Sequence, residues 1–262
     1  MDESHREAAD AWEASAAAYI AFQDADDRHR SMLLDPVMLE LCGDVRGKRV
    51  LDIGCGEGRF CRMLADRGAG AVGIDITPTL IRTAHERQAA AREAGADDRA
   101  DPARGFLRGS AEQLPLAEAS FDLAVSYVTL VDIVDYAAAI RESARVLAPG
   151  GMLVAANTGF VTASDGWQRD EAGKRLYHRI DRYAEERSQV YEWVGIRIVN
   201  RHRPLSHYMQ AYLGAGLILR DFLEPVPSDE SLRADDWFED WFRVPQFTVM
   251  RWEKPAAANS EN

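Results

Sequence analysis

The run from Val50 to Gly58 (Val50-Leu51-Asp52-Ile53-Gly54-Cys55-Gly56-Glu57-Gly58) constrains the fold more than any other feature of the chain. It is a short apolar segment, then three glycines at alternate positions, and a helical pattern follows it. Glycine has no Cβ, so the backbone of such a turn can come close to a ligand. The helix after the turn directs its free N–H groups and the positive end of its dipole to the same place. The run therefore predicts a buried strand whose carboxyl end holds a nucleotide-like ligand.

Strand and helix patterns alternate on both sides of this turn. The spacing predicts strands over 48–53, 71–75, 106–109, 120–126 and 152–156, and helices over 57–67, 77–95 and 136–147. Such alternation favours an α/β fold, in which a parallel sheet carries helices on both faces. Right-handed crossovers then place the ligand at the carboxyl ends of the strands.

The two ends of the chain have different patterns from this core. An alanine-rich helix is expected over 4–22, then a polar break, then a helix that Asp35 caps with Pro36 at its first position. After the core we expect a loop and charged helix over 160–188, an antiparallel strand over 190–201, a helix over 206–213, and strands over 217–222 and 247–252 on either side of an acidic segment, 229–240.

These patterns predict one domain over residues 1–254, because 262 residues with 47% hydrophobic content suit a single large core. Its expected parts are an N-terminal helical cap (1–47), a ligand-binding core (48–156), a lid insertion (157–203) and C-terminal strands (204–254), with a disordered tail (255–262).

Composition narrows the function classes. The net charge of −12 disfavours nucleic acid and anionic membranes as partners. A local basic group, Arg197, Arg201, His202 and Arg203, is interpreted as a solvated strand face.

Three cysteines without a CxxC pair predict neither a disulfide framework nor a zinc site, and no metal is expected. No apolar run approaches the length of a membrane span, and the charged start has no signal-peptide core. We therefore expect the protein in the cytoplasm.

The glycine spacing bears on which nucleotide is bound. A dinucleotide fingerprint needs G-x-G-x-x-G, and here Gly54 and Gly56 fit while Arg59 occupies the third glycine's place. Asp75 ends the next strand, where its carboxylate can accept hydrogen bonds from both hydroxyls of a ribose. Thr77 is available to cap the following helix, so we assign Asp75 to ribose binding.

A third polar element, Ser110 to Leu116, follows the third strand and suits an adenine ring. Together these motifs resemble the class I S-adenosylmethionine-dependent methyltransferases, in the small-molecule branch that includes ubiquinone and menaquinone methyltransferases. The matching segments are 50–58, 73–75, 110–115, 121–124 and 145–151. The resemblance spans about residues 48–156 and implies a Rossmann-like sheet of seven strands whose last strand is antiparallel.

The resemblance also implies roles for individual residues. Asp52 would lie under the amino group of the cofactor, and Gly54, Cys55 and Gly56 would face its methionyl part. Asp75 would hold the ribose. The remaining candidates are Ile76 against the adenine, Ser110, Ala111 and Glu112 around its amine, Ser126 and Tyr127 near the sulfonium, and Tyr19 and Arg30 over the cofactor carboxylate, with Arg28 competing with Arg30.

The implied reaction is an in-line transfer of methyl from S-adenosylmethionine to an O, N or C nucleophile of a small molecule, with release of S-adenosylhomocysteine. No catalytic residue is assigned, since the candidate bases (His178, His202 and His207) equally suit surface or core-edge positions. The aromatic residues of the insertion either form a wall of the acceptor pocket or pack the insertion onto the sheet: Trp167, Tyr177, Tyr183, Tyr191 and Trp193.

Two alternatives remain open at this point. An NAD-linked oxidoreductase would use Asp75 equally well, although Arg59 counts against it. A non-catalytic S-adenosylmethionine-binding regulator would keep the same first motif. The sequence predicts neither the methyl acceptor nor the oligomeric state.

Overall fold

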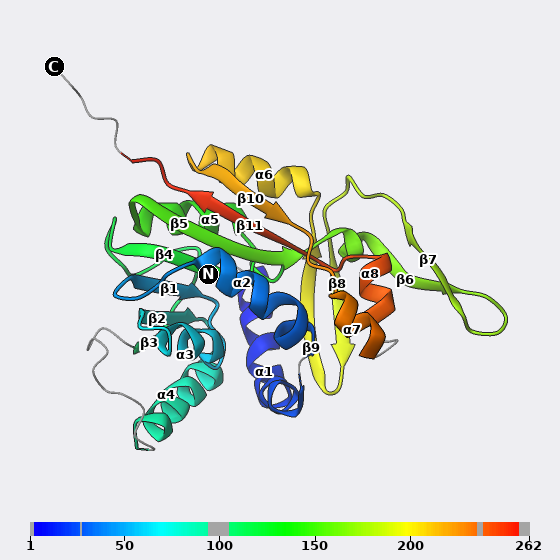
Figure 1. Cartoon of the computed structure of the whole chain (residues 1–262), viewed down its shortest axis with the longest axis horizontal. Helices are drawn as coiled ribbons and strands as arrows, with labels where there is room; N and C mark the ends of the chain where they lie inside the picture. The colour runs from blue at the N-terminus through cyan, green and yellow to red at the C-terminus, as the bar shows by residue number, and fades with distance from the viewer. Residues whose placement is uncertain (1–2, 27, 94–104, 235–237, 257–262) are drawn as a thin grey trace.

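The computed structural model describes residues 3–26, 28–93, 105–234 and 238–256. The loop expected over 96–104 and residues 257–262 of the expected tail lie outside these ranges. A seven-stranded sheet in the order β10-β11-β5-β4-β1-β2-β3 forms the centre (Figure 1). Its strands are β1 (Arg49–Ile53), β2 (Gly70–Asp75), β3 (Gly105–Arg108), β4 (Phe121–Tyr127), β5 (Leu147–Thr158), β10 (Ile218–Leu223) and β11 (Phe247–Glu253).

The direction of the strands confirms the predicted fold class. Strands β1 to β5 pair in parallel, whereas β11 is antiparallel to both of its neighbours, β5 and β10. The helices around the sheet are α1 (Glu3–Asp26), α2 (Asp35–Cys42), α3 (Arg59–Ala65), α4 (Pro78–Glu93), α5 (Tyr136–Val146), α6 (Leu205–Gly214), α7 (Asp229–Ala234) and α8 (Glu239–Arg243), with a π-helix, η1 (His29–Leu34), and a 3-10 turn, η2 (Phe160–Ala163). The acidic segment 229–240 thus contributes to two short helices.

Two hydrophobic cores lie on opposite faces of the sheet. Successive strand residues point to opposite faces, so Val50 joins the core under α2, α3 and α4 while Leu51 joins the core under α5 and α6. Val249 and Met250 divide in the same way on β11. Both faces are buried, which explains why the central strands are apolar almost without interruption.

The insertion after β5 differs from the expectation. The charged helix predicted within 160–188 is wrong: these residues form η2 and a hairpin of β6 (Ser164–Arg169) and β7 (Arg175–Ile180). The turn explains this, because the Asp170 carboxylate accepts backbone N–H groups of Ala172 and Lys174, and Gly173 has a φ of +82°. A second hairpin, β8 (Arg187–Trp193) and β9 (Ile196–His202), contains the predicted antiparallel strand.

The N-terminal segment covers the carboxyl edge of the sheet (Figure 1). The prediction that Asp35 caps α2 is wrong, since Leu34 is the N-cap and makes no side-chain cap bond. The Asp35 carboxylate instead pairs with Arg59, and Pro36 occupies the first turn as expected. No helix among the described residues is both long and apolar enough to cross a membrane.

Candidate functional site

A cavity of about 760 Å³ lies at the carboxyl ends of β1, β2 and β4. Helix α1 and the two hairpins of the insertion form its other walls. All of the predicted cofactor-binding residues except Ser126 line this cavity, although they come from six separate stretches of the chain.

The glycine turn forms one end of the cavity. The N–H groups of Gly54 and Cys55 both donate to the carbonyl of Ile74, at 2.8 and 3.0 Å, which holds the turn against β2. Gly54 has a φ of +72°, and a Cβ there would lie 2.2 Å from Cγ2 of Thr129. A Cβ on Gly56 would point across the cavity toward the Tyr19 ring, 3.8 Å away. Gly54 is therefore needed for packing, and Gly56 keeps the cavity open.

Asp75 lies beside this turn and orders it. Its carboxylate accepts the N–H of Gly56 at 3.0 Å and the N–H of Thr77 at 2.8 Å. Burial raises the pKa of Asp75, and these backbone bonds act against that rise. Asp75 thus shares the capping role that the sequence assigned to Thr77. Each carboxylate oxygen still has a lone pair for a ligand hydroxyl.

Asp52 carries an unsatisfied buried atom. Its Oδ2 accepts a weak bond from Cys61 Sγ at 3.4 Å, while Oδ1 has no hydrogen-bond partner among the described residues. Burial raises the pKa of Asp52 to about 7. A buried carboxylate in this state is stabilised by a cation, so the site suits the amino group of a methionyl ligand.

Tyr19 and Arg30 meet above the glycine turn. Nη2 of Arg30 donates to the Tyr19 hydroxyl at 2.5 Å, and its guanidinium lies 5.0 Å from the centroid of the Tyr127 ring. Arg28 is exposed and is not among the described residues that line the cavity. Of the two arginines that the sequence left open, Arg30 is therefore the one that lines the cavity.

The polar stretch after β3 lines another part of the cavity. Ser110, Ala111 and Glu112 line it together with Ile76. The Ser110 hydroxyl accepts the N–H of Glu112 at 3.2 Å. One oxygen of Glu112 lies 2.9 Å from Nε2 of His5, on α1. This part of the cavity combines the polar groups of Ser110 and Glu112 with the apolar side chain of Ile76, a combination that suits an adenine ring.

The end of β4 departs from the expectation at one position. Ser126 is buried below the cavity, and the next residues to line it are Tyr127, Val128 and Thr129. Val128 has a φ of +57°, an unfavourable conformation for a β-branched residue. Sequence reasoning missed Val128 and Thr129. Their position directly after the fourth strand was the available signal.

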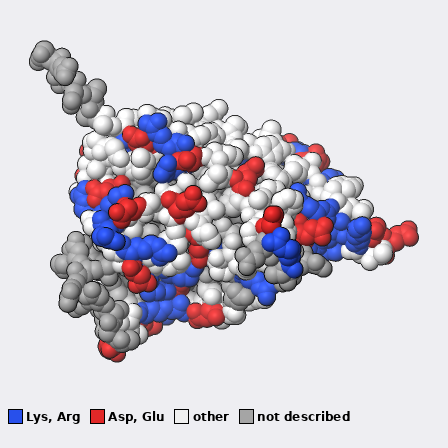
Figure 2. Space-filling model, in the orientation of Figure 1, with Lys and Arg blue, Asp and Glu red and all other residues white. Residues whose placement is uncertain are grey.

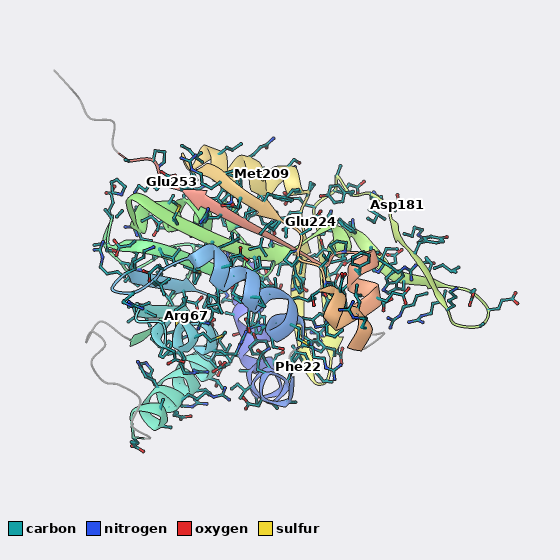
Figure 3. The ribbon with its side chains drawn as sticks, in the orientation of Figure 1. Phe22, Arg67, Asp181, Met209, Glu224 and Glu253 are labelled. Carbon is teal, nitrogen blue, oxygen red and sulfur yellow. The ribbon has the colours of Figure 1, made fainter. Side chains whose placement is uncertain are left out.

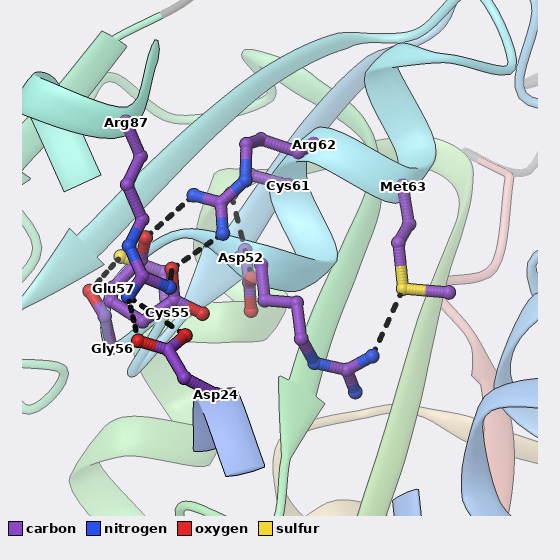
Figure 4. Close-up of polar contacts among 10 residues, drawn as sticks. Asp24, Asp52, Cys55, Gly56, Glu57, Cys61, Arg62, Met63 and Arg87 are labelled. Carbon is purple, nitrogen blue, oxygen red and sulfur yellow. Dashed lines mark hydrogen bonds and ion pairs between the residues drawn. The ribbon is translucent and has the colours of Figure 1, made fainter. Parts of the chain in front are cut away.

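Glu57, within the glycine turn, was also missed. Its buried carboxylate pairs with Arg62 at 2.5 Å and with Arg87 of α4 at 3.0 Å (Figure 4). Arg87 also reaches Asp24 of α1 at 2.8 Å. This network fastens the glycine turn to the helix that covers the cavity.

The aromatic residues of the insertion divide into two groups. Trp167, Tyr191 and Trp193 line the cavity, and Trp193 packs edge-on against Phe22. Phe22 is on α1 and is labelled in Figure 3. Tyr177 is exposed. Tyr183 instead packs on the insertion itself, where its carbonyl lies 2.8 Å from Nε2 of His202.

The three candidate bases divide in a similar way. Only His178, among these three, lines the cavity, with Nδ1 2.9 Å from the Ser164 hydroxyl. Burial lowers the pKa values of His178 and His202. His207 pairs with Glu186 at the surface.

The basic group of β9 is not the solvated face that the sequence suggested, apart from the exposed Arg197. Arg203 is buried and donates to the carbonyls of Leu130, Ile133 and Val134. Arg201 donates to the carbonyl of Asp132 at 2.6 Å. The insertion thus holds the loop after β4 in place.

Comparison with known proteins finds a family with a similar sequence. The sequence profile of the family described as "Methyltransferase domain" matches residues 51–155. The chain is 32% identical over 133 residues to malonyl-[acyl-carrier protein] O-methyltransferase of Serratia marcescens, covering 50% of this chain and 47% of that protein. It is 35% identical over 125 residues to 27-O-demethylrifamycin SV methyltransferase of Amycolatopsis mediterranei, covering 47% and 43%. The chain thus spans about half the length of these curated relatives.

A solved structure matches over a longer stretch. The S-adenosylmethionine-dependent methyltransferase of Mesorhizobium loti superposes with a TM-score of 0.71 at 27% identity, covering 83% of this chain and 96% of that one. The sequence match includes the glycine turn, Asp75 and the strand before the insertion. Residues 51–155 thus match a methyltransferase domain, and the chain as a whole is similar to S-adenosylmethionine-dependent methyltransferases.

Proposed function

We propose that this protein transfers a methyl group from S-adenosylmethionine to a small molecule. The observation that carries the proposal is one cavity that joins two unlike ends. One end has the glycine turn, the unsatisfied Asp52 oxygen and Asp75. The other end has the aromatic residues of the insertion. A volume of about 760 Å³ is within the range of pockets that hold drug-sized ligands.

The polar end fits the cofactor group by group. Asp52 would hold its amino group, Arg30 its carboxylate, and Asp75 its ribose hydroxyls. Ser110 and Glu112 would bracket its adenine. When bound, S-adenosylmethionine supplies an electrophilic methyl group, so the protein mainly has to align the acceptor. Such alignment can lower a barrier by roughly 7–11 kcal/mol.

The aromatic end supports an apolar small-molecule acceptor. Trp167, Tyr191 and Trp193 line the cavity there, and Phe247 of β11 lines it as well. On the face shown in Figure 2, basic and acidic side chains lie close together, unlike the continuous basic surface that binds nucleic acid. The cysteines (Cys42, Cys55 and Cys61) are buried free thiols, which accords with the reducing cytoplasm that we propose for the protein.

Ligand-dependent thermal stability tests the cofactor class. S-adenosylhomocysteine should raise the unfolding temperature at concentrations above its Kd, and NADH should not, because only ligands that bind the native state stabilise it. A shift with NADH alone would favour the oxidoreductase alternative. Binding of S-adenosylhomocysteine without methyl transfer to any acceptor in a broad small-molecule panel would favour a regulator.

A further inference from the structure

An acid that the proposed function does not use lies in the loop after β4. Asp132 lines the cavity, and its backbone N–H donates to the carbonyl of Thr129 at 3.0 Å. The Thr129 hydroxyl in turn lies 3.4 Å from the carbonyl of Gly54. A single tight turn therefore separates Asp132 from Thr129, the residue that contacts the glycine turn.

The insertion holds this acid in a defined orientation. The Asn200 amide, from β9, donates to Oδ1 of Asp132 at 2.5 Å. Asn200 also lines the cavity, as does its neighbour on the same strand face, Ile198. The carboxyl group thus lies where the cofactor end of the cavity meets the wall that the insertion provides.

The arginines around Asp132 donate their hydrogen bonds to other groups, so the Asp132 carboxylate can still accept a proton. Arg201 and Arg203 donate to backbone carbonyls of the loop after β4 and of β9, and Arg203 also donates to the Tyr208 hydroxyl. Burial raises the pKa of Asp132 to about 7, while the Asn200 bond and then the two arginines lower it, and Asp75 across the cavity raises it. A group that ionises near neutral pH is an efficient proton acceptor under ordinary conditions.

We propose that Asp132 is the general base of the reaction and that the acceptor is an uncharged aromatic compound with a phenolic hydroxyl. This inference rests on the proposed function. The acceptor oxygen gives its proton to the Asp132 carboxylate as it bonds to the methyl carbon. The carbon–sulfur bond breaks, its electron pair stays on sulfur, and Asp132 later releases the proton to water. Asn200 is a positioning residue that holds the carboxylate.

The acceptor class follows from the cavity and from acidity. Aromatic side chains of the insertion suit stacking against a flat ring. A phenol has a pKa of about 10, close enough to that of the buried acid for proton transfer to assist attack. His178 is the competing base, but it is on the β6–β7 hairpin and its Nδ1 lies 2.9 Å from the Ser164 hydroxyl of the same hairpin, whereas Asp132 is on the loop that contacts the glycine turn.

The test uses the full chain with labelled S-adenosylmethionine and para-substituted phenols and 2-naphthol as acceptor probes. Asp132→Asn should reduce kcat by about 10²–10⁴-fold, with a greater loss for less acidic phenols. The wild-type rate should rise with pH through a limb near 7, and this limb should be missing in the variant. Carboxyl-labelled NMR should show two aspartate signals that titrate near pH 7, from Asp52 and Asp132, and only one of them should be lost in Asp132→Asn.

Two further variants sharpen the test. Asp135→Asn makes the same chemical change in the same loop, at an exposed side chain that caps α5, and should keep the wild-type rate. Asn200→Ala should move the pH limb to higher pH, because the amide donor that stabilises the charged carboxylate is gone. A merely structural role for Asn200 would lower the rate without moving the limb.

Several outcomes would overturn the inference. Equal rates for Asp132→Asn and the wild type would show that Asp132 is not the general base. Weakened S-adenosylhomocysteine binding with an unchanged saturated rate would make Asp132 a cofactor ligand instead. Cofactor binding without transfer to any phenol would reject the acceptor class, and absence of cofactor binding would reject the proposed function itself.

Discussion

The core over residues 48–156 and the insertion over 157–203 build the two ends of one cavity by different means. In the core, backbone groups and short side chains at strand ends do the work, as at Gly54 and Asp75. In the insertion, large side chains on two hairpins form the wall. The core thus presents a polar site whose geometry is set by the backbone, as suits one fixed cofactor. The insertion presents an apolar surface whose shape depends on how the two hairpins pack.

Besides covering the cavity, the insertion supports neighbouring parts of the fold. Its strand β9 bonds to α1, where the Ser15 hydroxyl accepts the N–H of Arg197 at 3.0 Å. It also holds the loop after β4 through Arg201 and Arg203. A deletion of 160–200, which the lid interpretation suggests as a test, would therefore remove support from the core as well.

The largest effect is expected at Arg203. Arg203→Met removes donors from three loop carbonyls in a buried place, and should lower the free energy of unfolding by about 3–5 kcal/mol in urea titration. Arg197→Met, on the exposed face of β9, should stay within about 0.5 kcal/mol. Equal losses for the two variants would mean that Arg203 does not support the loop.

A smaller effect is expected at Asp75. Asp75→Ala should weaken S-adenosylhomocysteine binding by about 2–4 kcal/mol in calorimetry, the scale of charge-assisted hydrogen bonds to two hydroxyls. Asp66→Ala, at an exposed helix end, is the matched control and should bind as the wild type does. Unchanged affinity in folded Asp75→Ala would reject the ribose assignment.

The pH dependence of binding tests Asp52. Its pKa of about 7 means that it becomes protonated on acidification, and only the charged form attracts the ligand's ammonium group. S-adenosylhomocysteine affinity should therefore fall below pH 7, by up to about tenfold per pH unit, and recover above it. Asp52→Asn should remove this slope. A slope that persists in the variant would place the amino group elsewhere.

The smallest effect on cofactor affinity is expected from the β6–β7 hairpin. Ser164 and Ile180 are strand partners, so a short Gly–Ser linker can join them in place of 165–179. S-adenosylhomocysteine affinity should stay within about tenfold, or 1.4 kcal/mol, while methylation of the phenol probes is lost because the cavity wall that contains Trp167 is gone. Retained methylation would show that the acceptor binds away from this hairpin, and a larger loss of affinity would show that the two ends are coupled.

The sequence by itself determined the parts that depend on local backbone geometry. Alternate glycines with positive φ, apolar strands and Asp75 at a strand end are visible without any distant contact, because each reflects the conformation of a few adjacent residues. They were sufficient to predict a parallel sheet with a ligand at the carboxyl ends of its strands, whereas the antiparallel last strand was expected from the family resemblance.

Only the tertiary structure decided how the insertion completes the cavity. The charged residues of 160–188 have no single local preference, and hairpin pairing together with the Asp170–Gly173 turn made them strands. Asn200 meets Asp132, and Arg203 meets the loop after β4, across about 70 residues of chain. Such long-range contacts depend on how two elements pack against each other, and the side-chain pattern within either element does not encode them.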